Sequence, residues 1–200
     1  MKKITSLLLL TVSLLWSCTE NNLIDSGIAD GNIPDKTMYE YLQSDNYNWA
    51  LTVEMINHAD LVSLFNGEDA NYPEIMFMGL TSHSIRKWLY EQNLTVVAEA
   101  DPEVCREILL RHVFTDLYMR DDIPARQDGG VMITSVGGAE IQLFSEEELD
   151  PTYGVGPVLV KFTSADGFTV RDAQVASADI HPANGIVHAM HYDYIIDQLH

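Results

Sequence analysis

Residues 178–190 are Ala178-Asp179-Ile180-His181-Pro182-Ala183-Asn184-Gly185-Ile186-Val187-His188-Ala189-Met190, the most specific stretch of this sequence. Asn184-Gly185 is a strong signal for a tight turn between two strands, because both residue types tolerate a positive φ. The apolar residues after the turn predict a strand that runs toward Met190. We therefore expect Asn184-Gly185 to turn the chain into its final strand.

Helical patterns come before this end of the chain. Apolar residues recur at helical spacing in five segments. These segments are 38–42, 49–56, 61–65, 85–89 and 104–109. Thr81 is expected to cap the fourth helix through its hydroxyl, and Asp101 the fifth, with Pro102 at its first position. Cys105, on the fifth helix, is expected to be a small core residue.

Strand patterns dominate the rest of the domain. The expected strands are 75–78, 131–134, 140–144, 155–162 and 168–170. Asp166-Gly167 is expected to form a tight hairpin turn between the last two of them. Because most helices precede most strands, the order indicates an α+β domain rather than a doubly wound sheet.

Three stretches resemble the motifs of the fasciclin domain family. Residues 75–85 are similar to its first motif and keep the threonine as Thr81; residues 108–113 are similar to the second and keep the histidine as His112. Residues 178–190 are similar to the closing motif, with Asn184, Gly185 and His188. These five are the family-motif residues, and we expect them to be structural.

The resemblance implies a fasciclin-like β-sandwich wedge with N-terminal helices packed along one side, covering 37–200 as a single domain. It also implies cell adhesion or extracellular binding, without a shared catalytic centre and without a cofactor. Arg111 stands where the family usually has a tyrosine that is implicated in integrin adhesion in animal members. Integrin-type recognition is therefore not expected.

The N-terminus predicts export. Lys2 and Lys3 precede an apolar run that ends in Leu15-Trp16-Ser17-Cys18, which resembles a bacterial lipoprotein box. Residues 1–17 would be a signal peptide, Cys18 the lipidated residue, and 18–36 a flexible tether. We expect an outer-membrane lipoprotein at the cell surface or on the periplasmic face; the alternatives stay open.

The net charge of −19 argues against a nucleic-acid partner, because an acidic surface repels phosphate. With Cys18 lipidated, Cys105 has no partner for a disulfide bond within the chain. The remaining partners are the membrane, through the lipid anchor, and a protein or carbohydrate outside the cytoplasm. Ligand-binding residues are not identified, but four tyrosines outside the expected core are candidates for stacking on a sugar or packing on a partner, with packing inside the domain itself as the alternative for each. They are Tyr118, Tyr153, Tyr192 and Tyr194.

A metal-dependent envelope hydrolase is the alternative function. Histidines and a carboxylate cluster near the C-terminus, as in many zinc and iron sites. The cluster consists of His181, His188, His191 and Asp193. In a strand, however, His188 and His191 would point to opposite faces and could not grip one ion without a bulge. We therefore expect no metal site and no catalytic residue.

Overall fold

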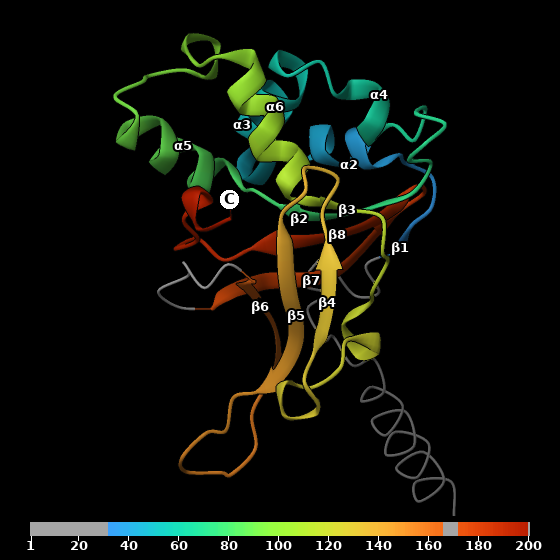
Figure 1. Cartoon of the computed structure of the whole chain (residues 1–200), viewed down its shortest axis with the longest axis vertical. Coiled ribbons are helices and arrows are strands. Elements are labelled where there is room, and N and C mark those ends of the chain that lie inside the picture. Colours follow the sequence, from blue (N-terminus) through green and yellow to red (C-terminus); the bar gives the residue numbers. More distant parts are fainter. Residues whose placement is uncertain (1–31, 166–171, 200) are drawn as a thin grey trace, which may run out of the picture.

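The computed structural model describes residues 32–165 and 172–199. Its helices come mainly from the first half of the chain and its strands mainly from the second, as Figure 1 shows. The helices are α2 (Met38–Ser44), α3 (Asn46–His58), α4 (Val62–Phe65), α5 (Ser82–Glu91) and α6 (Pro102–Arg111). The strands are β1 (Asn32–Ile33), β2 (Ile75–Gly79), β3 (Val113–Phe114), β4 (Val131–Thr134), β5 (Glu140–Glu147), β6 (Val158–Ser164), β7 (Ala173–Pro182) and β8 (Gly185–Met190). The predicted α+β class is therefore confirmed.

Local capping explains where several helices begin. The Thr37 side chain accepts a hydrogen bond from the Glu40 amide, and the Glu40 carboxylate accepts one from the Thr37 amide, which forms a capping box at α2. Asp101 accepts from the Glu103 amide at the start of α6, as predicted. Thr81 occupies the N-cap position of α5, but the prediction of a side-chain cap was wrong. Its hydroxyl lies 3.4 Å from the Ser84 hydroxyl instead.

The strands follow one continuous path of pairing. The order is β3-β2-β8-β7-β6-β5-β4, with β1 beside β7. β2 and β8 are parallel, and the other neighbours along this path are antiparallel. A bridge between Phe114 and Ser135 brings the two ends of the path together, so the sheet is nearly closed. The finer description as a sandwich wedge stays a prediction.

The helices gather at one end of the molecule, above β2, β3 and β8, while β4 and β5 extend away from them (Figure 1). Large side chains such as Trp49, Phe65 and Phe77 are fully buried between the helices and the sheet. Cys105 also lies in this core, where burial raises the pKa of its thiol to about 11. The thiol is therefore a packed, protonated core group.

Two segment boundaries differ from the pattern in the sequence. Asn32 and Ile33 fall in the range assigned to the tether, yet they pair in parallel with β7. β6 begins at Val158 rather than at residue 155, because Pro157 has no amide hydrogen to donate to a strand partner.

The expected signal peptide, Cys18, the Asp166-Gly167 turn and the strand 168–170 lie outside the described residues. Within the described ranges, none of the helices has the length and apolar character needed to cross a membrane.

Candidate functional site

Asn184 and Gly185 join the closing turn to the helical layer. The Asn184 side chain accepts a hydrogen bond from the Met38 amide at 2.6 Å and donates one to the Phe65 carbonyl at 3.1 Å. Its own carbonyl accepts from the Ile75 amide at 3.2 Å. One nearly buried residue therefore connects the first turn of α2, the end of α4 and the start of β2 to β8. This arrangement holds the fold together and leaves no amide group of Asn184 for a ligand.

His112 is a fully buried residue at the end of α6. Because the Ile108 carbonyl can only accept, Nδ1 carries the proton and donates to it at 2.7 Å. Nε2 then accepts from the Tyr194 hydroxyl at 2.8 Å. Burial lowers the pKa of His112 to about 4, with the nearby Arg111 charge acting in the same direction. His112 is therefore neutral and connects α6 to the C-terminal segment.

The neutral state of His112 predicts a loss of stability in mild acid. Its pKa is lower in the folded state than the unfolded value of 6.5, so the unfolded chain takes up the proton first as pH falls. The stability that neutral His112 contributes is fully present above the unfolded pKa. As pH falls from 6.5 to 5, we expect the protonation of this group to lower the free energy of unfolding by about 2 kcal/mol. Chemical denaturation across this pH range measures it.

One variant separates this effect from the titration of other groups. We expect His112→Gln, which cannot titrate, to be less stable at pH 7.5 but to show a shallower pH dependence than the wild type. An unchanged slope in His112→Gln would contradict the assignment.

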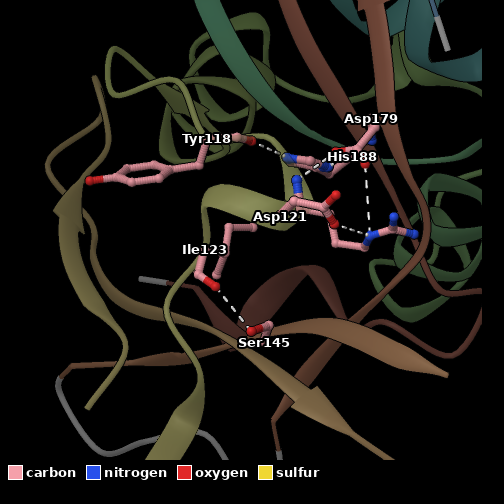
Figure 2. A network of polar contacts seen from close by, with 7 residues as sticks. Tyr118, Asp121, Ile123, Ser145, Asp179 and His188 are labelled. Atoms are coloured by element: carbon pink, nitrogen blue, oxygen red, sulfur yellow. Dashed lines mark hydrogen bonds and ion pairs between the residues drawn. The ribbon is translucent and has the colours of Figure 1, made fainter. Parts of the chain in front are cut away.

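His188 is the second fully buried histidine, and Figure 2 shows it beside Tyr118 and Asp179. Its Nε2 donates to the Tyr118 carbonyl at 2.9 Å, and its Nδ1 accepts from the Asp179 amide at 3.3 Å. Burial lowers its pKa. The Asp179 carboxylate accepts from the Arg120 amide at 2.6 Å, so the same cluster secures the chain after β3. Both ring nitrogens of His188 are occupied by the protein's own groups.

The structure does not bring the C-terminal histidines together as ligands. His188 is buried, whereas His181 is exposed on β7. His191 follows β8, and its Nδ1 lies 2.5 Å from the Asp193 carboxylate. Within residues 32–165 and 172–199, no group of three His, Cys, Asp or Glu side chains could hold a metal ion.

A cleft of about 900 Å³ opens at the carboxyl ends of β2 and β8. Its lining comes from the α2–α3 junction, the first turns of α5, strands β7 and β8, and the residues that follow β8. Thr81 is the one family-motif residue in this lining. The volume lies within the range typical of ligand-binding clefts, about 300 to 1,000 Å³. This cleft is the candidate functional site.

The four tyrosines predicted as contact residues lie in different places. Tyr192 lines the cleft and is 65% exposed. Tyr153 is exposed in the loop between β5 and β6, and Tyr118 is half-buried against the core. Tyr194 lies in the core, where its ring packs on His112 and Phe162, so for this tyrosine the alternative of packing inside the domain holds. Of these four predicted tyrosines, Tyr192 alone lines the cleft.

The sequence reasoning missed Tyr47, which also lines the cleft and is 91% exposed. A signal for it was present. Asp45 accepts hydrogen bonds from the Tyr47 and Asn48 amides and so starts α3. Tyr47 lies in the first turn, off the face that buries Trp49 and Ile56, so an outward position could have been predicted.

No protein-family model matches the sequence, and no curated protein matches it either. Among solved structures, a FAS1 domain pair from the insect cell adhesion molecule fasciclin I is similar, with a TM-score of 0.57 and 17% sequence identity. The match covers 78% of this chain and 50% of that chain, so this chain spans about half the length of the domain pair. The similarity covers most of this chain, which therefore has a fasciclin-like α+β fold.

Proposed function

We propose that this protein is a lipid-anchored, exported fasciclin-type module that binds a protein or carbohydrate partner at the cell envelope and serves adhesion or recognition. The observation that carries the proposal is the fold, which resembles FAS1 domains of an insect cell adhesion molecule. The open cleft supports a binding role. The family-motif histidines are committed to internal hydrogen bonds, which favours a non-enzymatic module.

The proposed anchor also explains how a modest affinity would suffice. A lipid on Cys18 would hold many copies of the domain at one membrane, and a flexible tether would let neighbouring copies bind one surface together. Multivalent attachment of this kind can exceed the single-site affinity by about a hundredfold or more. Weak binding by a single domain is therefore compatible with strong attachment of the cell.

Cys18→Ser tests the anchor. In cells that process lipoproteins, we expect the wild-type protein to incorporate labelled fatty acid and to sediment with the membrane. The Cys18→Ser protein should lose the label and most of its membrane association, because serine cannot accept the thioether-linked lipid. Cys105→Ala is the matched control, since Cys105 is buried in the core and its removal should leave the label in place.

Attachment and location complete the test. Cells that produce the protein should attach to a ligand-coated surface more strongly than cells that lack it, and Cys18→Ser should abolish the difference. Protease treatment of intact cells, with a periplasmic protein as the leakage control, then distinguishes the two faces of the outer membrane. Equal attachment with and without the protein would overturn the adhesion proposal, and protection from protease would redirect it to partners inside the envelope.

A further inference from the structure

The exposed part of the cleft lining has an unusual composition. Its exposed large side chains are aromatic or carry amide, imidazole or guanidinium groups. They are Asn46, Tyr47, Asn48, His83, Arg86 and Tyr192. The large aliphatic side chains in the lining, Ile180 and Met190, are buried and belong to the core. A ligand in this cleft would therefore contact aromatic rings and polar groups rather than an aliphatic pocket.

Tyr192 is held in place although its ring is exposed. The His83 ring, from α5, meets the Tyr192 ring edge-on, with the two ring centroids 6.1 Å apart. The centroid of the His191 ring lies 4.3 Å from that of Tyr192. The Asp193 carboxylate holds the His191 ring through Nδ1. An aromatic ring fixed in this way loses little conformational entropy when a ligand packs on it. The Tyr192 ring is therefore preorganised for stacking.

Tyr47 supplies a second exposed ring from another part of the lining. The Asp45 carboxylate accepts from the Tyr47 amide at 3.1 Å, from the Asn48 amide at 3.2 Å and from the Asn48 side chain at 2.6 Å. The turn that carries Tyr47 is thus fixed by its own cap. Arg86 lies in the same cleft and forms no ion pair or side-chain hydrogen bond with another described residue, so its guanidinium is available to a ligand.

We propose that the cleft binds a neutral oligosaccharide, with sugar rings stacked on Tyr47 and Tyr192 and hydroxyls bonded by Asn48, His83 and Arg86. The C–H faces of a pyranose pack on aromatic rings, while its hydroxyls both donate and accept, as the amide and imidazole groups here can. This inference rests on the proposed binding function and names the ligand class and the site.

A peptide ligand fits the cleft less well. β8 is paired on both sides, with β2 and β7, so it offers no edge for an added strand. β7 pairs with β6 only at Ala173 and Gln174 and with β1 only at His181 and Pro182, so within the lining it pairs with β8 alone. The described lining, however, has no exposed large aliphatic side chain that would form a pocket for a peptide anchor, and this favours a sugar over a protein segment.

The charges favour a neutral sugar over an acidic one. Arg86 is the only Lys or Arg in the described lining, and Asp45 is the only acidic residue there, so the local charges balance. The whole chain carries a net charge of −19. A polyanion would therefore be repelled on its approach to the cleft.

The test uses full-length protein in detergent and a panel of oligosaccharides built from glucose, xylose, mannose or galactose, with oligogalacturonate as the acidic comparison. We expect at least one neutral oligosaccharide to bind in a calorimetric titration. Tyr47→Ala and Tyr192→Ala should each weaken that binding by about tenfold, since each removes one stacking surface. Tyr192→Phe keeps the ring and should stay close to the wild type.

Tyr90→Ala is the matched control, because Tyr90 is 83% exposed on α5 but does not line the cleft. It should leave affinity unchanged, and all variants should keep the wild-type Tm. Binding of no neutral oligosaccharide, binding of oligogalacturonate alone, or equal losses in Tyr90→Ala would each overturn the proposal. If producing cells attach to a surface but neither the cleft variants nor soluble oligosaccharide reduces attachment, the sugar site fails while the binding function stands. If producing cells do not attach at all, the proposed function itself fails.

Discussion

Gly185→Ala is expected to leave the domain largely unfolded. A Cβ at this position would lie 1.8 Å from the Ile75 carbonyl oxygen and 2.9 Å from the Ile75 carbonyl carbon and amide nitrogen, and the φ of Gly185 is +140°. All three atoms belong to the backbone of β2, which cannot move away without breaking its parallel pairing with β8. We expect a loss of about 4 kcal/mol or more, a large part of the stability of an ordinary domain. Thermal unfolding followed by circular dichroism measures it.

Gly138→Ala is the control for this variant. Gly138 also has a positive φ, of +84°, but nothing lies within 4 Å of its Cβ position. Gly138→Ala should lower the free energy of unfolding only through backbone strain, by about 1 kcal/mol. If Gly185→Ala lost no more stability than Gly138→Ala, the close approach of β8 to β2 would not be what demands glycine at residue 185.

Asn184→Ala is expected to have the second-largest effect. The variant removes the acceptor of the Met38 amide and the donor to the Phe65 carbonyl, and both hydrogen bonds are buried. A buried polar group left without a partner costs about 1 to 3 kcal/mol, so the two together should lower the free energy of unfolding by about 3 kcal/mol. Urea denaturation at neutral pH measures the change.

Asn57→Ala is the matched comparison for Asn184→Ala. Its amide also makes two hydrogen bonds, to the Val53 carbonyl and from the Tyr39 hydroxyl, but the residue is exposed. Water can replace the lost partners, so we expect a loss below about 1 kcal/mol. Equal losses in the two variants would mean that burial at Asn184 is not the source of the effect.

Local signals in the sequence predicted most helices correctly. The Asp101 cap with Pro102, for example, requires only neighbouring residues, and α6 begins where they indicate. Thr81 shows the limit of the same reasoning. The residue stands at the predicted cap, yet its hydroxyl faces Ser84, a choice of side-chain rotamer that the spacing of residues does not specify.

The candidate site was only partly predictable. Tyr192 was one of four candidate contact residues and lines the cleft, whereas Tyr194, two residues later, turns into the core and bonds His112. Alternation along a strand cannot separate these two residues, because both follow the end of β8. The sequence gives no sign that Arg86 differs from other exposed cations on helices. Its place in the cleft depends on the packing of α5 beside the α2–α3 junction.

The sequence by itself determined the α+β order, the helix starts and the turn at Asn184-Gly185, because these depend on backbone preferences and hydrogen bonds within a few residues. Only the tertiary structure decided that β2 and β8 pair in parallel and that Asn184 reaches Met38, 146 positions away. The cleft has the same origin. Its aromatic and polar side chains come from segments far apart in the chain, and the packing that brings them together leaves no periodic trace in any one of them.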